Sequence, residues 1–303
     1  MITIMPIIDC LKYTKGAVED VLLQTLDTRL LIVDNGSNDE TRAWLDEAQL
    51  RDPTRVIVWH HLPPLPSLAA TWNRALHFAW EIGENRAFVI NNDVHLHEQT
   101  FERLSRVLDL TAALFVTATG ISNALPAELD ESDTPYGGPD FSCFCIRRSC
   151  HERFPFDERY IPAYCEDLDY HRRLLLDGEG SRIFSANVPF VHFASRTINR
   201  SPEAFKAFQA GARQSQAYHA AKWGGGPNEE RYTVPFDPKS GIDSDVSTHT
   251  LFDHARAAGL GVVEEDELQA ESMVADTTQP VVAAAPQAEL RLRLDEPDAP
   301  PTA

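Results

Sequence analysis

The chain has 303 residues, of which 43% are hydrophobic and 24% are charged, and its formal net charge is −19. This length allows one large domain or two modest ones, and the acidic balance excludes a general binder of nucleic-acid phosphates. No apolar run approaches the length of a transmembrane helix, and the N-terminus lacks the basic segment of a secretory signal. The five cysteines include no Cys-x-x-Cys pair, which favours a reduced, cytoplasmic protein without a zinc site.

Strands and helices alternate through the first part of the chain. Short apolar runs predict buried strands at residues 2–8, 30–33 and 56–59, and a fourth that ends at Asp93. Helical spacing predicts helices between them, at residues 16–25, after a cap at Ser37 or Asn38, and from Ser67 to Gly83. Such alternation predicts an α/β fold with a mostly parallel sheet and helices on both faces.

The pattern is looser beyond Asp93. We predict helices at residues 101–108 and 166–176, and strands at 114–116, 141–146 and 188–193. Residues 120–139 are rich in Gly, Pro, Asp and Ser and are expected to form a long loop of the kind that often covers a site. A second loop region is expected at residues 195–235, and no internal repeat is evident.

The composition changes at about residue 237. From there to the end the chain holds 14 acidic and 4 basic residues, and it ends in low-complexity sequence. Such a segment buries too little apolar surface to offset the entropy lost on ordering. We therefore expect residues 237–303 to form a disordered acidic tail behind a single domain at residues 1–236.

Polar side chains follow two of the predicted strands. Asn91, Asn92 and Asp93 end the fourth strand, and Asp34 ends the second. Ligands of open α/β sheets bind beyond the carboxyl ends of the strands, and hard oxygen donors suit Mg²⁺ or Mn²⁺. The alternative is that these residues only form turns.

A second group of candidates lies later in the chain. Glu166 and Asp167 open a predicted helix, and His192 ends a short predicted strand. Asp93 and His192 could form a metal site with two protein ligands, in which a substrate phosphate fills other positions. As alternatives, the two acids could serve only as charges at a helix N-terminus, and His95 and His97, which alternate with Asp93, could form a rival site or a solvated surface.

The order of these motifs resembles family 2 of the glycosyltransferases, which have the glycosyltransferase-A fold, and is similar to bacterial and phage members. The resemblance extends from residue 2 to about residue 236, and the segments that carry it are residues 23–25, 31–39, 72–74, 91–93, 137–147, 156–169 and 222–225. One departure is Asn91, at the first position of the family's Asp-x-Asp motif. A carboxamide is a weaker cation ligand than a carboxylate, so either the metal affinity would be lower or the ion would depend more on His192 and on the diphosphate.

The resemblance implies metal-dependent, inverting transfer of a sugar from a nucleotide-sugar donor to a hydroxyl of a glycan, a lipid-linked molecule or another acceptor. Asp167 would be the general base, with Glu166 beside it in a mainly structural role, and Asp93 and His192 would hold Mn²⁺ or Mg²⁺. A nucleotide-binding half would cover residues 1–110 and an acceptor half residues 111–236. The donor would contact Pro6, Asp34, Asn35, Asn73, Asn92 and Gly138.

Two other functions stay open at this point. A sugar-1-phosphate nucleotidyltransferase would also use a doubly wound sheet and a metal, but such enzymes usually carry a glycine-rich basic loop after the first strand. Here that strand leads to Asp9, Cys10, Leu11 and Lys12. A non-catalytic module that binds sugar nucleotides or glycans would fit Asn91 and Asn92.

The tail generates a first testable prediction. Removal of the residues after about position 240 should leave the midpoint of thermal unfolding nearly unchanged, because the segment lacks apolar periodicity. Thermal unfolding of the full-length and truncated chains measures this. A large loss of stability on truncation would mean that the tail packs on the domain.

Overall fold

The computed structural model describes five ranges, which are residues 1–111, 113–121, 124–129, 140–193 and 201–241. Contacts divide the chain into two units, Met1–Val262 and Val263–Ala303, and every described residue belongs to the first unit. Gly138 and nearly all of the predicted tail lie outside the described residues. The proposed halves of the domain and the tail therefore stay predictions.

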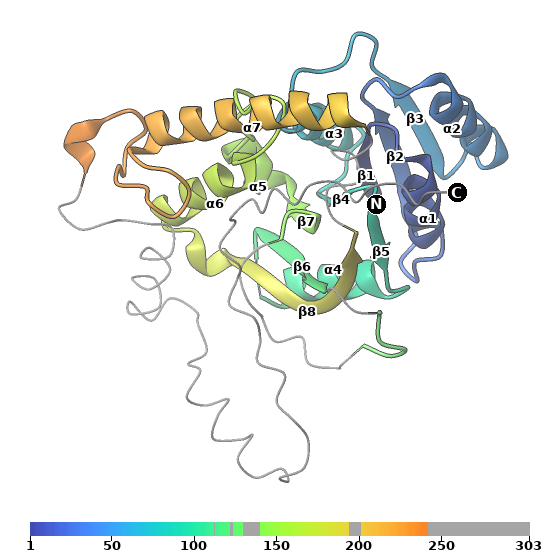
Figure 1. Cartoon of the computed structure of the whole chain (residues 1–303). Helices are drawn as coiled ribbons and strands as arrows, with labels where there is room; N and C mark the ends of the chain where they lie inside the picture. Colours follow the sequence, from blue (N-terminus) through green and yellow to red (C-terminus); the bar gives the residue numbers. More distant parts are fainter. Residues whose placement is uncertain (112, 122–123, 130–139, 194–200, 242–303) are drawn as a thin grey trace, which may run out of the picture. The chain divides into compact units, whose positions relative to one another are not determined.

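Eight strands and seven α-helices make up the described part of the chain (Figure 1). The strands are β1 (Ile2–Ile7), β2 (Arg29–Asp34), β3 (Val56–His60), β4 (Arg86–Ile90), β5 (Val94–Leu96), β6 (Phe115–Ile121), β7 (Cys143–Arg147) and β8 (Ile183–His192). The helices are α1 (Leu11–Leu22), α2 (Asp39–Arg51), α3 (Leu68–Glu81), α4 (Thr100–Leu110), α5 (Arg148–Arg153), α6 (Glu166–Leu176) and α7 (Pro202–Trp223). No helix in the described ranges is long and apolar enough to span a bilayer.

The strands form one sheet in the order β3-β2-β1-β4-β7-β6-β8-β5. The four strands β3, β2, β1 and β4 are parallel, and so are β6 and β8. Strand β7 is antiparallel to β4 and β6, and β5 is antiparallel to β8. The predicted α/β fold with a mostly parallel sheet is confirmed, and the antiparallel strands are confined to its second part.

The short link between β4 and β5 shows that the sheet curls. Only Asn91, Asn92 and Asp93 separate the two strands, and such a link spans at most about 14 Å. In a flat sheet, β4 and the edge strand β5 would lie four strand spacings apart, or about 19 Å. Curling of the sheet closes this gap and places the link beside the end of β8.

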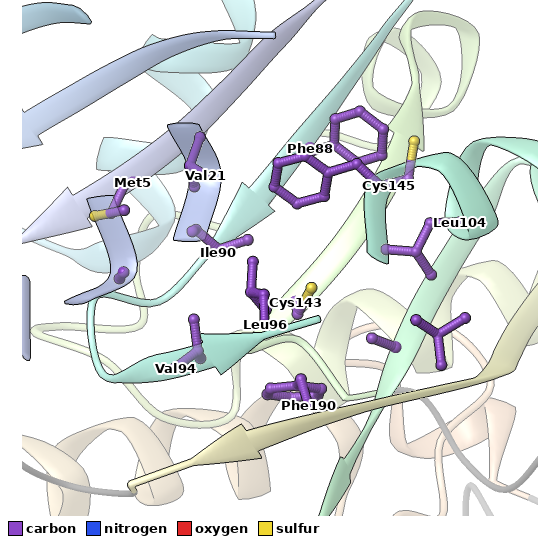
Figure 2. Packing of buried hydrophobic residues seen from close by; sticks show 14 of the residues in the cluster. Met5, Val21, Phe88, Ile90, Val94, Leu96, Leu104, Cys143, Cys145 and Phe190 are labelled. Atoms are coloured by element: carbon purple, nitrogen blue, oxygen red, sulfur yellow. The ribbon is translucent and has the colours of Figure 1, made fainter. Parts of the chain in front are cut away.

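Apolar side chains alternate between the two faces of the sheet, as the period of a strand requires. In β1, Met5 and Ile7 pack in the same cluster as side chains of α1 and α4. Figure 2 shows part of this cluster, with Phe88, Ile90 and Phe190. Ile2 and Ile4 belong to the other cluster, together with side chains of α3, α5 and α6. Helices therefore cover both faces, as predicted.

The predicted caps in the first part of the chain are confirmed. Asn38 accepts a hydrogen bond from the N–H of Thr41 at the start of α2, and Ser67 accepts one from Ala70 at the start of α3. Gly83 follows α3 with a φ of +90°, the left-handed conformation that favours glycine after a helix. Helix α1 begins at Leu11 rather than at residue 16, directly after a left-handed turn at Asp9 and Cys10.

Two predictions about the later part of the chain were wrong. Helix α7 occupies 22 residues of a region that was expected to form loops. Strand β8 begins at Ile183, five residues before its predicted start. The sequence does indicate the start of α7, because Ser201 caps the helix and Pro202 occupies its first turn. The sequence does not indicate the interior of α7, because the buried face of the helix includes the small or polar residues Gly211, Ala212 and Ser215 and so shows no apolar periodicity.

Gly211 generates a prediction about stability. A Cβ atom added at this position of α7 would overlap the ring of Pro162, so Gly211→Ala should destabilise the protein by about 1–3 kcal/mol. Gly16→Ala in α1 is the matched control, since nothing lies within 4 Å of the added atom. Alanine favours a helix over glycine, so this control should be neutral or stabilising. Thermal unfolding of both variants decides, and equal midpoints would contradict the close approach of α7.

Candidate active site

At the carboxyl edge of the sheet, the loops after β1 and β2 are joined to each other, and the link after β4 is joined to α1. The N–H of Asp9 donates to Ser37 Oγ at 2.8 Å, and Asp9 Oδ1 accepts from the N–H of Asn38 at 2.7 Å. Asn92 Nδ2 donates to Thr14 Oγ1 at 2.9 Å. Polar groups at the edge where ligands of such sheets bind are therefore held in place by one another.

Asp34 ends β2 and is completely buried. Its Oδ1 accepts from the N–H of Ser37, and its Oδ2 lies 2.7 Å from Nδ1 of His60. Nε2 of His60 lies 3.0 Å from Asp46. Burial lowers the pKa of His60, but the two carboxylates outweigh burial and the pKa is raised. Because Asp34 faces protein groups, its contact with a donor stays a prediction.

Asn35 and Asn92, two of the residues predicted to bind the donor, use their carboxamides to hold other segments of the chain. The side chain of Asn35 forms two hydrogen bonds with the backbone of Leu65, at 2.6 and 3.1 Å, and so fixes the proline-rich loop before α3. Pro6 is buried in β1 opposite Val33, and Asn92 is also buried. None of these placements tests a donor contact, which stays a prediction for all of them and for Gly138.

Asn73 does not face the apolar stripe of α3, yet it is 95% buried. Its Nδ2 donates to Phe156 O and to Glu158, and its Oδ1 accepts from the N–H of Phe156 and from Nε2 of His151. Trp80 donates to Nδ1 of His151, and burial lowers the pKa of His151 to about 4, so this imidazole is neutral. The four hydrogen bonds of Asn73 thus join α3 to α5 and to the segment between α5 and α6.

Asp93 and His192 meet as predicted. Asp93 Oδ1 lies 3.2 Å from His192 Nε2, and the backbone N–H of Phe193 donates to the carbonyl of Asp93. Register places Val94 opposite His192, which explains why the link after β4 reaches the end of β8. Ser142 Oγ lies 3.3 Å from the other ring nitrogen and orients the imidazole.

These two side chains fit a divalent ion that takes its other ligands from a substrate. The described residues contain no group of three or more His, Cys, Asp or Glu side chains arranged around a metal position. A carboxylate and an imidazole are suitable ligands for Mn²⁺ or Mg²⁺ when phosphate oxygens complete the shell. The rival arrangement does not form, because His95 pairs with Asp20 at 2.8 Å and His97 accepts from the N–H of Gln99.

Glu166 and Asp167 begin α6 directly after two residues in the left-handed conformation, Tyr164 and Cys165, with φ of 81° and 67°. Such backbone is unusual for residues other than glycine and clusters at functional sites. The turn directs the buried carboxyl of Glu166 into the protein, where its Oε2 has no hydrogen-bond partner among the described residues. Asp167 is half-buried, and its Oδ1 accepts from the N–H of Leu168.

The two adjacent acids differ in how firmly they hold a proton. Burial, together with the negative charge of Asp167, raises the pKa of Glu166 to about 8. Burial also raises the pKa of Asp167, and the charge of Asp140 adds to this effect. Because two adjacent carboxylates resist simultaneous ionisation and Glu166 is the more deeply buried of the two, Glu166 holds its proton more firmly than Asp167.

Asp140 lies beside the Asp93–His192 pair, because Ser142 contacts both Asp140 and His192, and it was missed in the sequence. Burial raises the pKa of Asp167 and lowers that of His192, and the charge of Asp140 acts to raise both, after the larger effect of Asp93 in the case of His192. Oδ1 of Asp140 accepts from the N–H of Ser142. A Cβ atom at Gly120 would lie 2.6 Å from its Oδ2, so the glycine makes room for this carboxylate.

A buried ion-pair network anchors α6 against α7. Lys222 is 97% buried, and its Nζ binds Asp157 at 2.7 Å and Asp169 at 2.5 Å. Trp223 Nε1 donates to Asp169, which is also bound by Arg173. Trp223 is therefore part of the core, and Asp169 is occupied by cations and cannot replace Asp167 as a base.

The comparisons with known proteins concern the family and the fold. Residues 3–118 match the family model described as glycosyl transferase family 2. No curated protein matches the chain in sequence. Among solved structures, TarS 1-349 of S. aureus aligns with a TM-score of 0.50 and 15% identity, over 70% of this chain and 64% of that one.

A second solved structure, GalNAc-T7 with UDP, GalNAc and Mn²⁺, aligns with a TM-score of 0.53 and 11% identity, over 63% of this chain and 43% of that one. The chain thus spans less than two thirds of either protein, and at these identities the likeness concerns the fold. Residues 3–118 therefore resemble glycosyl transferase family 2, and the domain that contains them has the glycosyltransferase-A fold.

Proposed function

We propose that this protein is a glycosyltransferase that moves a sugar from a nucleotide-sugar donor to an acceptor hydroxyl. The observation that carries the proposal is the contact between Asp93, directly after β4, and His192, at the end of β8, 3.2 Å apart at the carboxyl edge of the sheet. The family match over residues 3–118 supports it, and so does GalNAc-T7, a protein of the same fold that was solved with UDP, GalNAc and Mn²⁺.

We propose that Asp93 and His192 hold Mn²⁺ or Mg²⁺ together with the diphosphate of the donor. A divalent ion in this place would stabilise the negative charge that develops on the leaving diphosphate. Asn91 adds only a carboxamide, so the substrate must supply most of the remaining ligands. The ion should consequently bind more tightly with the nucleotide than without it.

Asp167 is the proposed general base. Its carboxylate takes the proton of the acceptor hydroxyl while the oxygen attacks the anomeric carbon and the bond from that carbon to the diphosphate breaks. Direct attack from the face opposite the leaving group inverts the anomeric configuration. A base works best when its pKa lies near the working pH, and burial moves the pKa of Asp167 upward, toward this range.

Glu166 has a different proposed role. With a pKa of about 8 it is neutral at the working pH, and its proton keeps a second negative charge away from Asp167. A neutral side chain of the same shape should serve equally well. The acceptor would be a glycan, a lipid-linked molecule or another compound with a free hydroxyl. We also propose a cytoplasmic location, because all five cysteines are free.

The two acids can be separated by matched substitutions. Asp167→Asn should lower turnover by about 10²–10⁴-fold, the usual contribution of a general base, and should leave the donor affinity nearly unchanged. Glu166→Gln mimics the protonated acid and should stay within a few-fold of the parent. Turnover with acceptor and donor affinity by calorimetry are the two measurements. Loss of activity in Glu166→Gln with retention in Asp167→Asn would reverse the assignment.

Stability provides a control for this pair. The pKa of Glu166 is raised above its unfolded value, so its contribution favours folding at low pH and is lost as pH rises from about 4.5 to about 8. Glu166→Gln should therefore lose less stability than the parent over this range. Parallel pH profiles of the thermal midpoint would show that Glu166 is ionised in the folded protein.

The metal proposal predicts that a chelator abolishes turnover and that Mn²⁺ restores it. Asp93→Asn should weaken donor binding in the presence of metal as well as turnover. Asp20→Asn is the matched control, because it breaks the other Asp–His pair of this region, with His95, and should leave the metal dependence intact. Full turnover in chelator would show that this chain works without a metal.

A product assay distinguishes the alternative functions. The protein is incubated with sugar nucleotides, Mn²⁺ and a pool of acceptors. Release of a nucleoside diphosphate with a glycosylated product supports transfer. Release of pyrophosphate indicates a nucleotidyltransferase, and binding without any product indicates a non-catalytic module.

A further inference from the structure

His60 occupies an unusual position at the end of the edge strand β3. It lies opposite Asp34 in the parallel register, and its two ring nitrogens face carboxylates from two different elements, Asp34 of β2 and Asp46 of α2. The imidazole is about one quarter exposed, Asp46 is largely exposed and Asp34 is not exposed at all. His60 therefore covers the buried carboxylate.

A chain of hydrogen bonds runs from His60 across the carboxyl edge of the sheet. His60 binds Oδ2 of Asp34, and the N–H of Ser37 donates to Oδ1 of the same carboxylate at 2.8 Å. Ser37 Oγ in turn accepts from the N–H of Asp9, whose own carboxylate accepts from Asn38. The carboxylate of Asp34 therefore holds the loops that follow β1 and β2, and His60 covers the side of this carboxylate that faces solvent.

We propose that His60, held in place by Asp46, is a positioning residue for the nucleotide end of the donor. The proposal rests on the proposed function, since it concerns the same edge of the sheet. His60 fixes Asp34, and Asp34 fixes the loops after β1 and β2 against which the nucleotide would lie. Loss of His60 should therefore weaken nucleotide binding and leave the chemical step nearly unchanged.

The arrangement requires a protonated imidazole. Both ring nitrogens of His60 face carboxylate oxygens, which can only accept, so both must donate. A neutral imidazole can keep its Nδ1–H directed at Asp34, but its Nε2 lone pair then faces the carboxylate of Asp46. The raised pKa of His60 agrees with this geometry. The contact with Asp46 is present at low pH and is lost as pH rises through the pKa of His60.

The central experiment compares three variants by calorimetry, in the presence of Mn²⁺ and with UDP, GDP and dTDP as probes. His60→Phe should weaken the affinity for the nucleotide that the parent binds most tightly by about tenfold, the effect of losing one hydrogen bond to a charged group. His60→Asn keeps an N–H in the place of Nδ1 and should recover most of the affinity. His77→Phe, at an exposed histidine of α3, is the control and should match the parent.

Two further measurements separate positioning from a general effect on folding. In turnover, His60→Phe should raise the donor KM about as much as the dissociation constant and should leave kcat within a few-fold. The parent should bind the nucleotide less tightly as pH rises through the pKa of His60. Asp46→Asn should flatten this dependence, because a carboxamide can either donate to or accept from the ring nitrogen.

The outcomes distinguish this inference from the proposed function. If the parent binds a nucleotide and His60→Phe binds it equally well, the positioning role is overturned and the proposed function stands. If the parent binds none of the three nucleotides, both the positioning role of His60 and the proposed function are overturned. If His60→Phe does not fold, His60→Asn and the pH profile of Asp46→Asn decide, and a profile parallel to that of the parent overturns the proposal.

Discussion

The pairing of Lys222 with Asp157 and Asp169 is the interaction on which the arrangement of the proposed catalytic helix depends. Removal of an ammonium group from water costs several kcal/mol, and only close carboxylates offset this cost. Lys222 meets this condition only if α7 lies against α6 and against the segment that carries Asp157. The pKa of Asp157 accordingly lies well below its usual range: burial would raise it, and the hydrogen bonds from Arg159 and Lys222 outweigh burial. The first turn of α6, which presents Glu166 and Asp167, is held by the charge pairing of Asp169 in the same turn.

Buried acids at the carboxyl edge of the sheet are also paired with basic side chains. Asp34 is buried with His60, and Asp93 is nearly buried with His192. In each pair, a histidine at the end of one strand lies beside an acid at the end of another. His60 of β3 pairs with Asp34 of β2, and His192 of β8 pairs with Asp93 after β4. This chain is strongly acidic, so buried carboxylates without such partners would repel one another as well as lose hydration. Glu166 differs from these acids, because no cation among the described residues pairs with it and its raised pKa favours the protonated form.

The sequence was sufficient for the elements whose burial is apolar. Strands β1, β2 and β4 are nearly continuous hydrophobic runs, and the stripe of α3 has helical spacing, so both were predicted. It was insufficient where burial depends on polar partners. Asn73 lies off the apolar stripe and is buried by four hydrogen bonds to distant residues, and α7 packs through Gly211 and Ser215. Likewise, the meeting of Asp93 with His192 was predicted from residue types and motif order, whereas His60 and Asp140 contact Asp34 and Thr117, which lie more than 20 positions away in the chain.

The link between β4 and β5 limits how this chain can vary. Its three residues cross from the centre of the sheet to its far edge, and the side chains of β5 alternate in and out immediately after it. An inserted or deleted residue would turn Val94 and Leu96 toward solvent and His95 into the core. The number of residues in this link is therefore fixed by the fold, but their chemistry is fixed only where a side chain has a partner. The backbone N–H of Asn91 holds the chain by its bond to Ser142 O, and this bond is indifferent to the side chain. The fold can consequently tolerate a carboxamide at position 91 whatever it does to the affinity for cations.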